Sequence, residues 1–110
     1  MNKYGFSDLE QTFIQNILNK HFHNIKDATI YLFGSRAKGS HRKYSDVDLI
    51  IDAQSNDLDL KISNFIEEWE NSNLPYKLDL IKYKDLYSPY KLEIEKTKTL
   101  YWENGRGDRI

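Results

Sequence analysis

Apolar residues in the first part of the chain recur with the period of an α-helix. Ser7 and Glu10 have the spacing of a capping box, in which each side chain bonds the backbone of the other residue. The apolar positions that follow are three or four residues apart and comprise Leu9, Phe13, Ile14, Ile17 and Leu18. This spacing predicts an amphipathic helix from about residue 7 to residue 22.

Three short runs further along the chain have the composition of β-strands. Residues 29–33 are β-branched and aromatic and end at Gly34, and residues 47–51 are apolar except for Asp48. A third run covers residues 76–82. Short apolar runs bounded by turn-forming residues are typical of largely buried strands, so we expect three of them.

Two more helices are predicted in the second half of the chain. Residues 58–71 carry apolar side chains at positions i, i+3, i+4 and i+7, and a helix-ending Asn-x-Pro sequence follows. Ser88-Pro89 is a typical helix start, and the stretch 92–98 is expected to carry the last helix. The element order predicts an α/β (α+β) fold, with helices packed on one face of a small mixed β-sheet.

Composition narrows the classes of protein that the chain can represent. A length of 110 residues suits a single domain over residues 1–110, and we expect residues 103–110 to be a flexible tail. Sixteen Lys and Arg against seventeen Asp and Glu give a net charge of -1, so no strong nucleic-acid binding is expected. The absence of Cys excludes disulfides, thiolate zinc sites and cysteine nucleophiles. No signal peptide or membrane span is evident, and we expect a cytoplasmic protein.

Acidic residues interrupt two of the predicted strands. Asp46 and Asp48 flank Val47, and because side chains alternate along a strand, both carboxylates should leave the sheet on one side, about 7 Å apart. Two such carboxylates repel each other unless a cation lies between them, and Mg²⁺ prefers carboxylate oxygen. Asp79 lies within the apolar run of a neighbouring strand, where burial disfavours a charge, and is a candidate third metal ligand.

A basic, glycine-containing segment lies between the first two predicted strands. Gly34-Ser35 ends the first strand and starts a possible helical turn, where backbone N–H groups bind phosphate well. Residues 36–44 then carry four fixed positive charges and no acid, on Arg36, Lys38, Arg42 and Lys43. The last two are equally compatible with a solvated loop. A phosphate-binding turn, a basic loop and cation-neutralised carboxylates are together the parts that phosphoryl or nucleotidyl transfer requires.

The spacing of these residues resembles a known signature. Gly34-Ser35, ten further residues and then Asp46-Val47-Asp48 resemble the pattern of the DNA polymerase beta-like nucleotidyltransferase superfamily. Residues 32–39 and 45–50 more closely resemble the MNT-type minimal nucleotidyltransferases of prokaryotes. Lys38 departs from the arginine that many relatives have at that position, which keeps the charge but loses the planar fork. Asp79 lies where the family has its third catalytic carboxylate.

The resemblance implies a nucleotidyltransferase fold and a role for each matching residue. Asp46 and Asp48 would bind two Mg²⁺ ions, and Asp79 would complete one metal site and help to activate the attacking hydroxyl. The nucleotide of the substrate ATP would be held by Gly34, Ser35, Arg36, Lys38 and Ser45.

The resemblance also implies a biological setting. Many such proteins are the antitoxin of a toxin–antitoxin module whose toxin is a HEPN-type ribonuclease, and some transfer AMP from ATP to a tyrosine of that toxin. We therefore expect a protein adenylyltransferase that forms a hetero-oligomer with a HEPN-type toxin. Two alternatives stay open, which are an antitoxin that neutralises by binding alone and an enzyme that modifies a small molecule or an RNA end. The short chain disfavours the last, because such enzymes usually carry additional domains for the acceptor.

Overall fold

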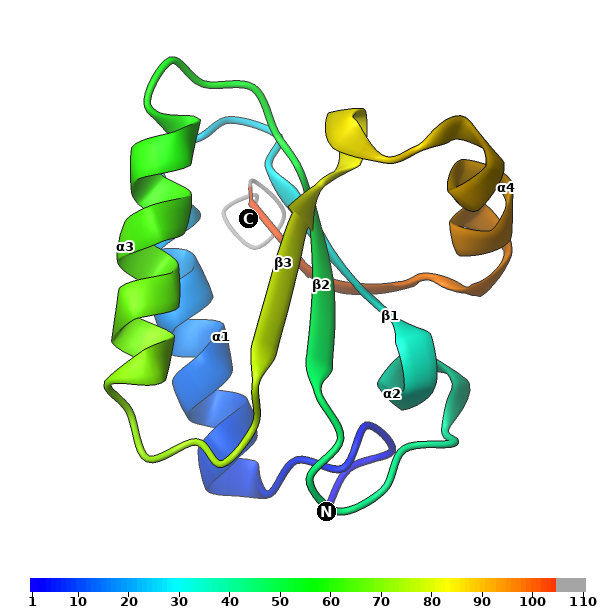
Figure 1. Cartoon of the computed structure of the whole chain (residues 1–110). Coiled ribbons are helices and arrows are strands. Elements are labelled where there is room, and N and C mark those ends of the chain that lie inside the picture. The colour runs from blue at the N-terminus through cyan, green and yellow to red at the C-terminus, as the bar shows by residue number, and fades with distance from the viewer. Residues whose placement is uncertain (105–110) are drawn as a thin grey trace, which may run out of the picture.

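The computed structural model describes residues 1–104, in which helices alternate with the strands of one sheet (Figure 1). β2 pairs parallel with β3 and antiparallel with β1, and β4 pairs antiparallel with β1, which gives the sheet order β3-β2-β1-β4. The predicted mixed sheet and α/β fold are confirmed. The elements in chain order are α1 (Asp8–Phe22), β1 (Thr29–Phe33), α2 (Gly34–Lys38), β2 (Val47–Asp52), α3 (Leu58–Glu70), β3 (Leu78–Lys82), a 3-10 turn (Tyr83–Asp85), α4 (Ser88–Thr97) and β4 (Thr99–Glu103).

The first helix begins at the predicted capping box. The Ser7 hydroxyl accepts a hydrogen bond of 3.1 Å from the Glu10 N–H, and the Glu10 carboxylate accepts one of 2.9 Å from the Ser7 N–H. Both bonds satisfy N–H groups that have no partner within the helix. This local chemistry explains why the start of α1 was predictable from sequence alone.

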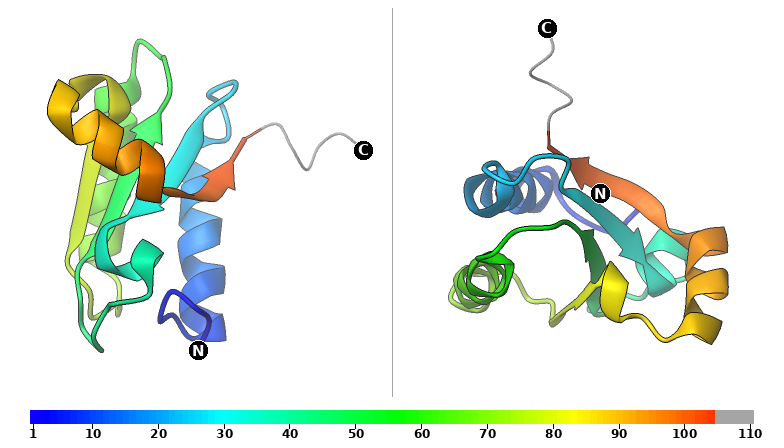
Figure 2. Two further views of the ribbon diagram at one scale, coloured as in Figure 1. Left: turned by 90° about the vertical axis from the view of Figure 1, so that its right-hand side faces the viewer. Right: turned by 90° about the horizontal axis from the view of Figure 1, so that it is seen from above.

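α1 and α3 lie next to each other on one face of the sheet, as expected (Figure 2). Their apolar faces meet the alternate side chains of the central strands that point towards them. The resulting core is almost completely buried and includes Ile14, Ile17, Leu18, Phe22, Ile30, Leu32, Val47, Leu49, Ile51, Phe65 and Trp69. None of the helices between residues 1 and 104 combines the length and apolar character that crossing a bilayer requires.

α4 lies on the opposite side of the sheet from α1 and α3 (Figure 2). Ile50 alternates with Leu49 and Ile51 and therefore faces that side, yet it is fully buried. Ile94 of α4 is buried as well, and the Lys98 ammonium that follows α4 lies 3.8 Å from the centre of the Tyr31 ring. The expectation of helices on one face thus holds for α1 and α3, whereas α4 covers part of the other face.

The end of the described chain differs from the sequence expectation. β4 was not predicted, and Glu103, which was expected to begin the tail, pairs with Thr29 at the edge of the sheet. The side-chain amide of Asn104 donates hydrogen bonds of 2.6 and 2.8 Å to the carbonyls of His23 and Ile25. The rest of the predicted tail, residues 105–110, lies outside the described residues.

Candidate active site

The strand β1 runs directly into α2, as the Gly-Ser sequence predicted. Phe33 is extended, and Gly34 begins α2 with a φ of +74°, a backbone conformation that residues with a side chain disfavour. A Cβ atom added to Gly34 would lie 2.5 Å from the Oδ2 atom of Asp48. Glycine is therefore required here for two reasons, the backbone conformation and the close approach of a carboxylate.

The three predicted carboxylates occupy the corresponding ends of two neighbouring strands. Asp48 and Asp79 are register partners in the parallel pair of β2 and β3, so their side chains leave the same face of the sheet at the strand spacing of about 4.8 Å. Asp48 is half-buried and Asp79 is exposed, although the apolar run around Asp79 suggested burial. Asp46 is exposed and lies one residue before β2 rather than within it.

The carboxylates influence one another electrostatically. Burial raises the pKa of Asp48, and the negative charges of Asp79 and Asp46 raise it further, against the opposing charge of Arg36. A bound cation would relieve this repulsion, and the oxygen donors have the chemistry that a hard divalent ion prefers. Among residues 1–104, no group of three or more His, Asp or Glu side chains is arranged closely enough to hold a metal ion. The negative charge and the carboxylate oxygens of the site nevertheless suit a divalent cation.

Arg36 has a different environment from the one that the sequence suggested. Its side chain is only 1% exposed, and all of its nitrogen atoms donate to backbone carbonyls. Nη1 donates to Tyr4 O at 2.7 Å, Nη2 to Ser45 O at 2.8 Å, and Nε to the carbonyls of Ser45 and Asp46 at 3.2 and 3.3 Å. These bonds engage one N–H of each nitrogen atom and give Arg36 a structural role beside its predicted contact with the nucleotide, which stays a prediction.

Two aromatic rings complete the surroundings of Arg36. The guanidinium carbon lies 4.3 Å from the centre of the Tyr76 ring and 4.9 Å from that of Phe6. No motif or spacing connects these residues with Arg36, because they come together only through the tertiary fold.

The other predicted nucleotide-binding residues differ in accessibility. Ser35 is half-exposed at the start of α2, and Lys38 is exposed at its end. Lys38 lines a cavity of about 230 Å³ together with Lys3 and Thr99. The Ser45 hydroxyl accepts a hydrogen bond of 2.7 Å from the Arg42 N–H, so Ser45 shapes the turn before β2. Ser35 and Lys38 therefore have free side-chain surface, whereas Ser45 is engaged in local structure.

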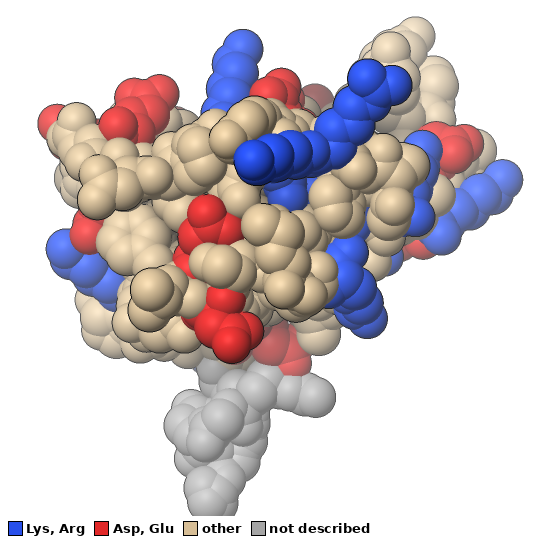
Figure 3. All heavy atoms as spheres, turned by 90° about the horizontal axis from the view of Figure 1, so that it is seen from below, with Lys and Arg blue, Asp and Glu red and all other residues tan. Residues whose placement is uncertain are grey.

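The surface charge around the molecule is mixed. Figure 3 shows that basic and acidic side chains share the face seen from below, with acidic groups near its middle. Arg42 and Lys43 are exposed, and the Lys43 ammonium lies 5.3 Å from the centre of the Tyr44 ring. This mixture agrees with the net charge of -1. A polyanion would therefore be attracted only by a local group of basic side chains and not by the surface as a whole.

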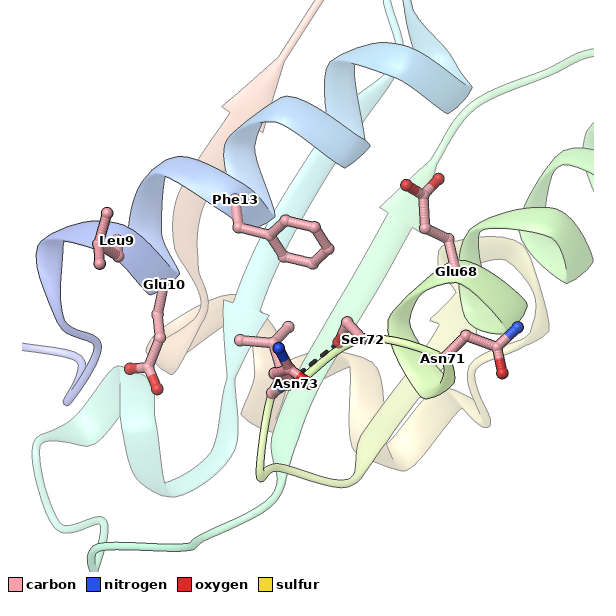
Figure 4. A pocket seen from close by; sticks show the side chains of 8 residues that line it. Leu9, Glu10, Phe13, Glu68, Asn71, Ser72 and Asn73 are labelled. Carbon is pink, nitrogen blue, oxygen red and sulfur yellow. Dashed lines mark hydrogen bonds between the residues drawn. The ribbon is translucent and has the colours of Figure 1, made fainter.

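A cavity of about 540 Å³ lies between the start of α1 and the end of α3 (Figure 4). Phe13 and Glu68 line it from the two helices, and Ser72 and Asn73 line it from the turn after α3. None of the predicted site residues contributes to its lining. The candidate active site and this cavity are therefore distinct features of the surface.

Comparison with known proteins gives a family match and one similar curated sequence. The model of the family described as polymerase beta, nucleotidyltransferase, matches residues 12–106. A Haemophilus influenzae protein named probable protein adenylyltransferase MntA is 40% identical over 58 residues, which are 52% of this chain and 50% of that protein. The match thus spans about half the length of the curated relative.

Three of the solved structures with a similar fold come from toxin–antitoxin systems. A toxin–antitoxin structure with AMP-PNP matches with a TM-score of 0.59 and 21% identity, over 86% of this chain and 76% of that chain. A mutant MntA–HpeT toxin–antitoxin complex gives 0.60 and 19%, over 89% and 75%. The complex of a tri-AMPylated Shewanella oneidensis HEPN toxin with MNT antitoxin gives 0.54 and 19%, over 89% and 76%. At these identities the likeness establishes the fold.

Proposed function

Because the chain belongs to the polymerase beta nucleotidyltransferase family, we propose that it transfers AMP from ATP to a hydroxyl group of a partner protein in an Mg²⁺-dependent reaction. The observation that carries this proposal is the placement of Asp48 and Asp79 on neighbouring strands, with Asp48 against the turn at Gly34. Acidic groups and a turn suited to phosphate meet at one end of the neighbouring strands β1, β2 and β3. That combination serves nucleotidyl transfer better than simple protein binding, which has no need for mutually repelling carboxylates.

Each residue of the site has a proposed role. Gly34 and Ser35 bind the phosphates of ATP through backbone N–H groups and the Ser35 hydroxyl, and the exposed Lys38 adds positive charge nearby. Asp46, Asp48 and Asp79 would hold two Mg²⁺ ions. Mg²⁺, when bound, neutralises triphosphate charge and makes the α-phosphorus a better electrophile.

The proposed reaction is a displacement at the α-phosphorus of ATP. The acceptor hydroxyl oxygen forms a new P–O bond, the bond between the α-phosphorus and the bridging oxygen breaks, and pyrophosphate leaves with its electron pair. Asp79 accepts the hydroxyl proton, a role that fits its exposed position because a hydroxyl carried by a protein must approach from solvent. The protein contributes positioning and charge, which are the main factors in this class of reaction.

The proposed acceptor is a tyrosine of a HEPN-type toxin, with which the chain would form a hetero-oligomer in the cytoplasm and act as its antitoxin. Support comes from the Shewanella oneidensis complex, in which the HEPN toxin is tri-AMPylated, and from the AMP-PNP in another similar structure. The name of the Haemophilus influenzae relative, a protein adenylyltransferase, agrees with this acceptor class.

The test is AMP transfer to a HEPN-type protein encoded next to this chain. The purified pair is incubated with ATP and Mg²⁺, and the intact mass of the acceptor is compared between the wild-type chain and an Asp46→Asn/Asp48→Asn double variant. We expect a mass gain of one AMP per modified tyrosine with the wild type only. Equal acceptor masses with both proteins would overturn the proposal, and neutralisation of the toxin by the double variant would identify binding as the mechanism.

A further inference from the structure

Arg36 ties several segments of the chain to one buried guanidinium group. The side chain starts in α2 and donates hydrogen bonds to the N-terminal loop at Tyr4 and to the loop before β2 at Ser45 and Asp46. It also contacts the ring of Tyr76, two residues before β3. The segments that carry every predicted carboxylate and the phosphate-binding turn therefore meet at Arg36.

The aromatic partner of Arg36 is itself held in place. The Tyr76 hydroxyl donates a hydrogen bond of 2.9 Å to the Glu10 carboxylate, which is also part of the capping box of α1. The Trp69 indole N–H donates one of 2.8 Å to the Tyr76 carbonyl. Arg36 therefore packs against a group that is fixed at both its backbone and its hydroxyl end, which limits the positions that the guanidinium can adopt.

The contact between Arg36 and the loop before β2 matters because Asp46 lies outside β2 and is not held by strand pairing. Pairing begins one residue later, where the Val47 N–H donates a hydrogen bond of 2.8 Å to the carbonyl of Lys77, the residue before β3. Asp46 lies one residue earlier, and its carbonyl is held by Nε of Arg36. The direction in which the exposed Asp46 carboxylate leaves the backbone thus depends on Arg36.

Only arginine suits this position chemically. Its planar fork places three nitrogen atoms towards several carbonyls at once, whereas lysine has one nitrogen atom at the end of a flexible chain. Burial lowers the pKa of Arg36, and the nearby charges of Tyr76, Glu10 and Asp46 oppose that change. Arginine keeps its proton in proteins, and the positive charge of Arg36 favours the ionised form of Asp48.

We propose that Arg36 is a positioning residue of the nucleotidyl transfer site, which holds the backbone of Ser45 and Asp46 so that Asp46 can share a metal ion with Asp48. This inference rests on the proposed function. It differs from the sequence-based expectation, because Arg36 acts through the acidic loop and does not touch the nucleotide. The two roles affect different quantities: a phosphate ligand sets the KM for ATP, whereas a positioning residue sets metal affinity and kcat.

The experiment compares Arg36→Lys with the wild type in two ways. Mn²⁺ binding is measured by electron paramagnetic resonance in the presence of AMP-PNP, and kcat and KM for ATP are measured in the AMP-transfer assay. We expect Mn²⁺ affinity and kcat to fall by roughly ten- to a hundredfold, the range typical of residues that orient metal ligands, with little change in KM. Wild-type Mn²⁺ affinity and kcat, or a rise in KM alone, would overturn the proposal.

Controls separate positioning from loss of stability. Ile17→Ala truncates a buried side chain of α1 on the helix-covered face, so it lowers Tm without touching Arg36 or the loop before β2. An equal loss of Mn²⁺ affinity in Ile17→Ala would contradict the proposal. If Arg36→Lys does not fold, Tyr76→Phe replaces it, because it removes the bond to Glu10 and should weaken Mn²⁺ binding in the same direction. Unchanged Mn²⁺ binding in Tyr76→Phe would then overturn the inference.

The design also distinguishes failure of the inference from failure of the proposed function. Absence of AMP transfer by the wild type would refute the proposed function, whereas the Mn²⁺ measurement would still test Arg36. Active wild-type protein together with an Arg36→Lys variant of unchanged kcat and Mn²⁺ affinity would refute the inference alone.

Discussion

Gly34 lies so close to Asp48 that a Cβ atom at residue 34 would be 2.5 Å from the Asp48 Oδ2 atom. The same glycine has a φ of +74°, in the left-handed region. Gly39, at the other end of α2, also has a positive φ of +79°, but no described heavy atom lies within 4 Å of its added Cβ. The two glycines share the backbone requirement and differ in the approach of a carboxylate, so each serves as a control for the other.

We predict that Gly34→Ala and Gly39→Ala will separate strain from catalysis. Both should destabilise the fold by about 1 kcal/mol because an L side chain disfavours positive φ. Gly34→Ala should in addition displace the Asp48 carboxylate and lower the AMP-transfer rate by about a hundredfold, since small misplacements of reacting groups are costly. Urea unfolding and the transfer assay measure the two effects, and similar transfer rates for the two variants would contradict the prediction.

We predict that Asp48→Asn will stabilise the metal-free protein at neutral pH. Burial, followed by the charges of Asp79 and Asp46, raises the pKa of Asp48. Between its ordinary and raised pKa values the folded protein binds more protons than the unfolded chain, so stability falls as pH rises through this window. Above this pH window, the ionised Asp48 carboxylate destabilises the folded wild-type protein. The asparagine side chain of the variant carries no charge and avoids this cost.

The measurement for Asp48→Asn is thermal unfolding with a chelator and with Mg²⁺. The variant should have the higher Tm in chelator, and only the wild type should gain stability from Mg²⁺, by about 2.7 kcal/mol at a concentration one hundred times the Kd. A lower Tm for the variant in chelator, or the same Mg²⁺ effect on both proteins, would be inconsistent with this account.

The pKa of Asp48 should fall when Asp79 loses its charge. After burial, Asp79 is the largest cause of the raised pKa, because the two residues are register partners in β2 and β3. Asp79→Asn removes that repulsion, so Asp48 should ionise at lower pH, as followed by carbon NMR of its carboxyl group without metal. Asp52→Asn, an exposed change at the far end of β2, is the control and should leave the titration of Asp48 unchanged.

The helix and strand positions that the sequence predicted depend on neighbours close in the chain. The start of α1 follows from a capping box that spans four residues, Ser7 to Glu10, and β1 and β2 follow from short apolar runs. The juxtaposition of Gly34 with Asp48 and Asp79 joins residues far apart in the chain. It was expected only because the spacing of these residues resembles the signature of a known family.

The parts that sequence missed depend on distant partners. The carbonyl acceptors of Arg36 are 9, 10 and 32 residues away in the chain, so no local pattern indicated that the fold buries its side chain. β4 is a strand because it pairs with β1, about seventy residues earlier, and its own short apolar run is too brief to predict this. Both the burial of Arg36 and the formation of β4 depend on contacts between segments far apart in the chain.

We predict that Trp69→Phe will destabilise the fold by about 1–3 kcal/mol, in the range for a buried carbonyl that loses its donor. The Trp69 indole N–H donates to the Tyr76 carbonyl at 2.8 Å within the buried core, and this bond anchors the chain just before β3. Trp102→Phe is the matched control, because Trp102 is only half-buried on β4 and should lose less packing. Urea unfolding gives both free energies.

The same variants should also differ in metal binding. Since Tyr76 packs against Arg36, Trp69→Phe should weaken Mn²⁺ binding more than Trp102→Phe. Equal Mn²⁺ affinities of the two variants would show that the bond between Trp69 and Tyr76 does not influence the active site.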